Sequence, residues 1–222
     1  MGVSAPVLTV DDLDLRLDGT TLWFVAEGSR HEVALDSIGE ASALEALDRI
    51  AAALGDGTPL PEAVSAAVAV APLPNHMQRF DLAEGTTILN DAHGADRNDM
   101  AAALRTLVQV TPPGRRSLAV LGQFDSDPAD FVEAHDAIGR LVVRLNVAKL
   151  VAVGDGARHL QSAAGLEGSW DGESVLVGTP EEAYDLLRDE IRGNDVVLVK
   201  GGSTTGLAAL GERLAAAGVA KW

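Results

Sequence analysis

Residues 90–97 concentrate polar side chains whose chemistry is suited to binding a ligand. This segment reads Asn-Asp-Ala-His-Gly-Ala-Asp-Arg, so two carboxylates, an imidazole and a guanidinium lie within eight residues. Such a group can bind a cation, an amine or a phosphate. A structural alternative stays open, because Asp96 or Asn98 could simply cap the helix that is predicted to follow.

A second segment, residues 195–206, joins an apolar run to a lysine and a Gly-Ser-Thr loop. The run predicts a buried strand that ends at Lys200, and the loop then opens a helix. Backbone N–H groups at a helix start attract an anion, and glycines let it approach closely. The lysine precedes the loop, so this is not a Walker A sequence. The alternative is a strand-to-helix turn capped by Ser203 or Thr204.

No metal pattern is visible among the histidines or cysteines. The chain has no cysteine and no H-E-x-x-H sequence, and its five histidines are far apart: His31, His76, His93, His135 and His159. We therefore expect no metal held by side chains alone. The lack of cysteine also excludes disulfides and thiolate chemistry, and it favours a cytoplasmic protein.

The charge and composition of the chain argue against some classes of binding partner. A formal net charge of -16 argues against binding of nucleic acid and against docking on an anionic membrane. No apolar run approaches the roughly 18 to 20 residues that cross a bilayer. The opening residues do not resemble a signal peptide. With 47% hydrophobic residues the chain is expected to fold as a soluble protein.

Apolar strands and helices alternate over residues 76–222. Strands are predicted at 86–89, 117–121, 150–153, 174–177 and 196–199, and helices at 97–108, 129–145, 156–164, 180–192 and 204–217. This alternation predicts an α/β domain with a parallel, Rossmann-like, doubly wound sheet. Ligands bind beyond the carboxyl ends of such strands, which makes the loops 90–98, 122–128 and 200–206 the candidate site.

Residues 1–75 have a different pattern and are predicted to form a separate, small α+β domain. A three-stranded antiparallel meander is expected over residues 7–35. Its apolar segments are 7–10 and 13–17, which both precede the first turn, followed by 21–25 and 31–35. Helices are predicted at 42–54 and 62–69, the second with Pro61 in its first turn. Proline residues after the second helix favour a domain boundary there.

Four segments together resemble the C-terminal domain of the Mur ligase family, and most of all its D-alanyl-D-alanine-adding (MurF) type. Residues 90–100 are similar to the family stretch D-D-[SA]-Y-N-A-N-P-D-S-M, and residues 119–124 to A-V-L-G-E-M. Residues 133–139 resemble E-H-x-x-[IV]-G with one residue inserted, and 194–201 resemble G-D-V-V-L-V-K-[GA]-S. The resemblance covers most of residues 70–222. It extends more weakly over 7–70, which look like the tail of the family's central domain.

The resemblance implies a site but also departures from it. By resemblance, the candidate ligand-binding residues are Asp91, His93, Asp96, Asn98, Lys200 and Ser203. The positions that resemble the family's adenine-contacting G-x-H-N-x-x-N carry Ala41 and Glu45 in place of histidine and asparagine. His76 stands where the family usually has arginine, and Gln123 where it has glutamate. No residue is assigned a catalytic role.

Two functions follow as hypotheses. The family's P-loop belongs to a part of the central domain that would precede residue 1, so we expect the chain not to ligate alone. The favoured hypothesis is a degenerate module, without a cofactor of its own, that acts as a binding or regulatory partner of a cell-wall synthesis protein. The alternative is half of a ligase that uses ATP and Mg²⁺ once an ATP-binding domain completes it. A homodimer through residues 7–35 is also expected, since a truncated sheet has open edges.

Overall fold

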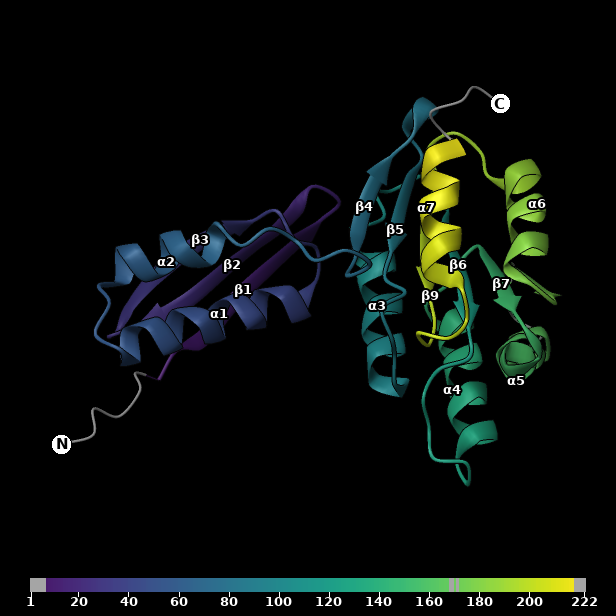
Figure 1. Cartoon of the computed structure of the whole chain (residues 1–222), viewed down its shortest axis with the longest axis horizontal. Helices are drawn as coiled ribbons and strands as arrows, with labels where there is room; N and C mark the ends of the chain where they lie inside the picture. Colours follow the sequence, from purple (N-terminus) through teal and green to yellow (C-terminus); the bar gives the residue numbers. More distant parts are fainter. Residues whose placement is uncertain (1–6, 168–169, 171, 218–222) are drawn as a thin grey trace. The chain divides into compact units, whose positions relative to one another are not determined.

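The computed structural model describes residues 7–167, 170 and 172–217, and the chain divides into two compact units between Leu73 and Pro74. The first unit is a three-stranded antiparallel sheet, in the order β1-β2-β3, with two helices (Figure 1). Its elements are β1 (Thr9–Arg16), β2 (Gly19–Ala26), β3 (Ser29–Leu35), α1 (Glu40–Gly55) and α2 (Leu60–Val68).

The meander predicted from the period-two pattern is confirmed, with one correction. The segments 7–10 and 13–17 belong to one strand, β1, whose register against β2 shifts between Val10 and Asp12. An extra residue at such a bulge interrupts the alternation without ending the strand. The core of this unit lies between the sheet and the helices and includes Leu22, Phe24 and Ile50.

The second unit is built on a six-stranded sheet with the order β4-β5-β9-β6-β7-β8. Its strands are β4 (Gln78–Asp81), β5 (Thr87–Asn90), β6 (Ser117–Gly122), β7 (Lys149–Val153), β8 (Glu173–Val177) and β9 (Val196–Lys200). The five strands β5 to β9 run parallel, and β4 pairs antiparallel with β5 at the edge. Strands β6, β7 and β9 are buried along their whole length, as apolar strands covered on both faces must be.

Helices cover both faces of this sheet, so the predicted doubly wound fold is confirmed. They are α3 (Arg97–Val110), α4 (Phe131–Arg144), α5 (Arg158–Gly165), α6 (Pro180–Glu190) and α7 (Leu207–Ala217), with short 3-10 turns at Ala83–Gly85 and Asp155–Ala157. One group is formed by α3, α4 and α5, and α6 packs on α7 in the other. Strand β9 contacts a helix of each group, α3 and α7, and Figure 1 shows α7 in yellow.

The strand order creates a switch point at β9. Strands β5 and β6 lead into α3 and α4 of one group, whereas β9, which lies between them, leads into α7 of the other. Chains that leave neighbouring strand ends toward opposite faces form the usual ligand-binding place of a doubly wound sheet. The fold therefore points to the carboxyl ends of β5, β9 and β6.

A search of the described residues for a bilayer-spanning helix, with the length and hydropathy that such a helix needs, finds none.

Candidate functional site

Three loops meet at the carboxyl ends of β5, β9 and β6, as the strand pattern predicts. Their backbones are joined directly, because the Asp125 N–H donates to the Ala95 carbonyl at 2.8 Å and the Gly202 N–H donates to the Gln123 carbonyl at 2.7 Å. The loop after β6 thus bonds to both of its neighbours. A displacement of any one of the three loops would therefore strain the hydrogen bonds to its neighbours.

Asp91 and Lys200 form a buried ion pair at the centre of this end of the sheet. The Lys200 Nζ lies 2.6 Å from the Asp91 Oδ2, and the two side chains are only 1% and 9% exposed. The ammonium also donates to the backbone carbonyls of Asp91 at 3.3 Å and Gly94 at 3.5 Å. The pair forms because β5 and β9 are adjacent parallel strands that end at the same level. All three N–H donors of Lys200 are used within the protein.

The charge on Asp91 is maintained despite its burial. Burial alone would raise the pKa of Asp91, but hydrogen bonds from His93 and Lys200 and the attraction of the Lys200 charge outweigh it. A further hydrogen bond comes from the Met77 N–H to Oδ1 at 2.9 Å. The pKa of Asp91 is consequently below its ordinary value, and the side chain is a carboxylate at neutral pH. Both oxygens already accept hydrogen bonds, so a ligand would have to replace one of these donors.

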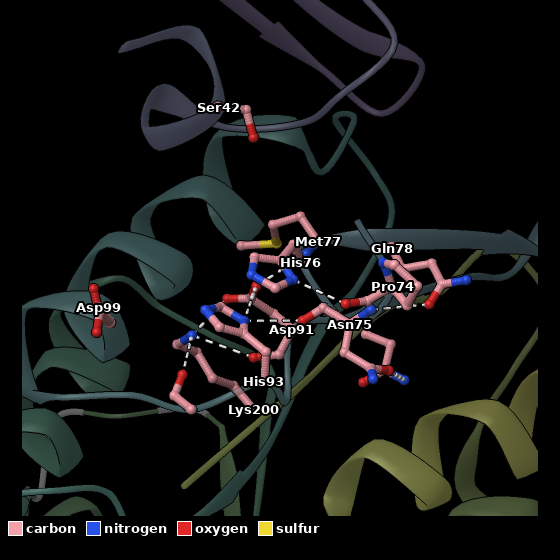
Figure 2. A network of polar contacts seen from close by, with 12 residues as sticks. Ser42, Pro74, Asn75, His76, Met77, Gln78, Asp91, His93, Asp99 and Lys200 are labelled. Carbon is pink, nitrogen blue, oxygen red and sulfur yellow. Dashed lines mark hydrogen bonds and ion pairs between the residues drawn. The ribbon is translucent and has the colours of Figure 1, made fainter. Parts of the chain in front are cut away.

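His93 lies at the solvent side of this pair. Its Nδ1 is 3.0 Å from the Asn75 carbonyl and 3.5 Å from the Asp91 Oδ1. Interaction with Asp91 is the main cause that raises the pKa of His93. The ring stacks on His76, with 3.6 Å between centroids and 14° between planes, and Figure 2 shows the two rings above Lys200. At 37% exposure, the His93 side chain is accessible to protons and to ligands.

The remaining predicted residues have different surroundings. Asp96 caps α3: its side chain accepts from the Asn98 and Asp99 N–H groups, and Asp99 bonds back to the Asp96 N–H in a capping box. This geometry gives Asp96 the structural role that was the alternative. Asn98 and Ser203 are exposed. The loop 200–206 turns before α7, which begins at Leu207 rather than at 204.

His135 is a residue of this site that sequence reasoning did not select. It is fully buried, and its Nε2 accepts from the Phe124 N–H at 3.3 Å while its Nδ1 lies 2.7 Å from the Phe131 carbonyl. The ring stacks on Phe124 and packs on Phe131. Burial lowers the pKa of His135, so it stays neutral and holds the loop after β6 against α4. The available signal was its place in the family-like segment 133–139.

Metal and phosphate ligation find little support in these side chains. Across residues 7–167, 170 and 172–217 no group of three or more His, Asp or Glu is placed to hold a metal ion. Lys200 has no donor left for a phosphate while it remains paired with Asp91. The side chains that remain accessible at this end include those of His93, Arg97, Asn98 and Ser203.

Comparison with known proteins agrees with this fold and extends it. Two curated UDP-N-acetylmuramoyl-tripeptide–D-alanyl-D-alanine ligases are similar in sequence. The protein of Mycobacterium leprae (strain TN) is 37% identical over 197 residues, which are 82% of this chain and 38% of that protein. The protein of Mycobacterium tuberculosis (strain ATCC 25618 / H37Rv) is 36% identical over 208 residues, 86% of this chain and 41% of that protein. The chain thus spans about two fifths of the length of these relatives.

Solved structures share the fold at lower sequence identity. MurF from Acinetobacter baumannii matches with a TM-score of 0.80 and 21% identity over 94% of this chain and 45% of that chain. The MurF ligase of Thermotoga maritima, solved in complex with ADP, matches with a TM-score of 0.78 and 15% identity over 94% and 46% of the two chains. Residues 77–203, more than half of the chain, match the model of the Mur ligase glutamate ligase domain. The chain therefore belongs to the Mur ligase family.

Proposed function

We propose that this chain is the C-terminal part of a MurF-type ligase of peptidoglycan precursor synthesis. In this role it acts in the cytoplasm and helps to join D-alanyl-D-alanine to a UDP-N-acetylmuramoyl-tripeptide, together with an ATP-binding part. The observation that carries the proposal is the extent of the match. An alignment of 197 residues at 37% identity is longer than the second unit and therefore includes residues of both units.

The arrangement at the carboxyl ends fits a role in positioning rather than in phosphate chemistry. ATP would activate a substrate carboxylate for attack by an amine, and the phosphates would have to be held outside this site because the Lys200 donors are occupied. The exposed groups of His93, Asn98 and Ser203 can bind polar atoms of a nucleoside or a dipeptide. The Asp91–Lys200 pair supports them by fixing the ends of β5 and β9.

An NMR titration of the isotope-labelled chain tests this proposal. Two-dimensional amide spectra are recorded with D-alanyl-D-alanine and, separately, with magnesium-ADP at millimolar concentration. We expect shifts confined to residues 91–98 and 201–206, with no change at Lys149, which lies at the other end of β7. Replacement of the exposed Asn98 by alanine should weaken these shifts. An absence of shifts with both compounds would exclude a ligand-binding ligase half.

A second candidate is a binding or regulatory partner that has lost ligation. It is favoured by Ala41 and Glu45, which are exposed on α1 and stand at positions that resemble the family's adenine contacts. A carboxylate there repels a nucleotide. Such a module would bind another cell-wall synthesis protein or a second copy of itself through its open sheet edges. If this candidate holds, the double variant Ala41→His, Glu45→Asn gains no ATP turnover, and measurable turnover would contradict it.

A further inference from the structure

The first residues of the second unit are fastened to the candidate site. Pro74 begins that unit, and the segment that follows bonds to the end of β5 and the loop after it. The Met77 N–H donates to the Asp91 Oδ1 at 2.9 Å, and the Asn90 Nδ2 donates to the Asn75 Oδ1 at 2.9 Å. Figure 2 shows Asn75 and Met77 of this segment beside Asp91. The place where the chain enters the second unit is therefore set by side chains of the site.

The backbone of this segment depends on these contacts. Asn75 and Met77 have φ values of 59° and 46°, in the left-handed region that side chains other than glycine rarely adopt. The strand β4 that follows is only four residues long and pairs with a single neighbour, β5. Local preference thus opposes the conformation, and it persists because the loop after β5 holds it.

The outermost contact is the stack of His76 on His93, which we call the histidine clasp. The His76 Nδ1 lies 2.8 Å from the Pro74 carbonyl, and the His93 Nδ1 lies 3.0 Å from the Asn75 carbonyl. Since a carbonyl only accepts, each Nδ1 carries the hydrogen, and Nε2 is the atom that takes up a further proton. Each ring therefore donates from Nδ1 to this segment, whether or not its Nε2 is protonated.

The groups around His93 oppose a positive charge on both stacked rings at once. Three ionisable groups face His93, namely Asp91 on its own loop, Lys200 at the end of β9 and His76 in the opposing segment. Asp91 favours the first proton on His93 and raises its pKa. If both rings were charged, two positive rings would be stacked with their centroids 3.6 Å apart. Like charges at this separation repel strongly, and Lys200 adds to the repulsion.

We propose that the histidine clasp is a proton-operated release for the segment 74–77, closed when at most one ring is charged and open when both are. Opening removes the stack, frees the Met77 N–H and leaves the Asp91 Oδ1 without this donor. Asp91 then has an oxygen available for a donor of a ligand. The release itself does not depend on the ligase role, whereas its consequence for ligand binding rests on the proposed function.

Amide hydrogen exchange without any ligand tests the release. The observable is the protection factor of the Met77 amide, measured on the full chain at about pH 8 and about pH 5. We expect protection to fall by about tenfold or more in the wild type, because a repulsion equivalent to about one pKa unit changes the opening equilibrium about tenfold. The variant His76→Phe retains a flat ring but takes no proton, so its Met77 amide should stay protected at the lower pH. His31→Phe is the matched control, because His31 packs on Phe24 in the first unit.

Each outcome decides the proposal. Equal protection of Met77 at the two pH values in the wild type overturns it, and so does an equal loss in His76→Phe. Amides of β6 and β7 in the same spectra report whether the variant is folded. Should His76→Phe fail that check, His76→Tyr supplies an uncharged ring with a polar edge for the same measurement. Because no ligand is present, failure here is distinct from failure of the ligase proposal.

Discussion

At the scale of single residues, the part of the chain that the structure describes contains two buried lysines whose surroundings differ. Lys200 and its partner Asp91 are both withdrawn from water, with side-chain exposures of 1% and 9%. Lys149 is also buried, at 4%, but its partners Glu173 and Glu190 are 68% and 34% exposed. Removing Lys200 therefore leaves the Asp91 carboxylate buried without a partner. Removing Lys149 leaves carboxylates that are already in contact with water.

This difference predicts unequal costs for the same substitution. Lys200→Met should lower the free energy of unfolding by about 3 kcal/mol or more, because it leaves Asp91 buried and unpaired. Adding Asp91→Asn should restore part of the loss, since the amide needs no counter-charge. Lys149→Met should cost less than about 1 kcal/mol. Urea unfolding of the four proteins checks the order, and equal costs for the two lysines would contradict it.

At the scale of elements, the loop after β6 is attached to α4 through His135. The Phe124 N–H has the imidazole Nε2 as its acceptor, and the neighbouring Gln123 carbonyl bonds to the loop after β9. Protonation of the ring would replace this acceptor by a donor and break the link. One neutral histidine thus supports two of the three loops of the site.

The pH dependence of stability should reflect this. Because the pKa of His135 is lowered on folding, its contribution is complete above about 6.5, the ordinary value, and is lost as pH falls toward the folded value. His93 has the opposite sign: its pKa is raised, so its contribution is present below about 6.5 and is lost as pH rises. We expect His135→Gln to flatten, and His93→Phe to steepen, the loss of stability between about pH 7.5 and 5. Unfolding curves at both pH values would contradict this if the two variants changed the slope alike.

Gly139 lets helices α4 and α5 approach each other closely. A Cβ atom at this position would lie 2.3 Å from the Leu160 carbonyl oxygen and 3.0 Å from the Ala163 Cβ. Gly139→Ala should therefore cost about 1–3 kcal/mol, the typical cost of overpacking. Gly165→Ala is the control, since its nearest contact would be the Ser174 Oγ at 3.4 Å. Thermal unfolding measures both, and equal midpoints would show that the helices separate freely.

Patterns within one element were readable from the sequence, and relations between elements were not. Apolar runs located the strands that are buried on both faces, such as Val196–Lys200, because burial itself selects such runs. The edge strand Gln78–Asp81 was missed, because four residues of mixed polarity have no strand pattern of their own and form a strand by pairing with β5. Asp91 and Lys200 were both selected, but 109 residues separate them, and their pairing depends on the strand order. The left-handed backbone conformation of Asn75 and Met77 was not predicted from the sequence.

At the scale of the whole molecule, each unit has its own hydrophobic core. One core cluster draws only on residues of the first unit, and another only on strands and helices of the second. Stabilisation by burial increases with size, so a unit of about 70 residues is marginal alone whereas one of about 150 is self-sufficient. The two units should therefore differ in their independence.

A fragment that starts at Pro74 should fold alone. We expect its amide spectrum to overlay that of the full chain for residues of β5 to β9, because its core needs no residue of the first unit. The complementary fragment that ends at Leu73 should unfold at lower temperature, by reason of its size. If the amide signals of the larger fragment lost their chemical-shift dispersion, the boundary between Leu73 and Pro74 would not separate independent folding units.

The position of β9 also determines when the second sheet can form during synthesis of the chain. The strand that occupies the middle of the second sheet is the last of the six to leave the ribosome, and β5 and β6 have no shared neighbour until it arrives. A nascent chain that has emerged only as far as α6 must keep the facing edges of β5 and β6 unpaired, exposed to proteases and to other strands. This sheet is thus completed at its centre, and only after β9 has emerged.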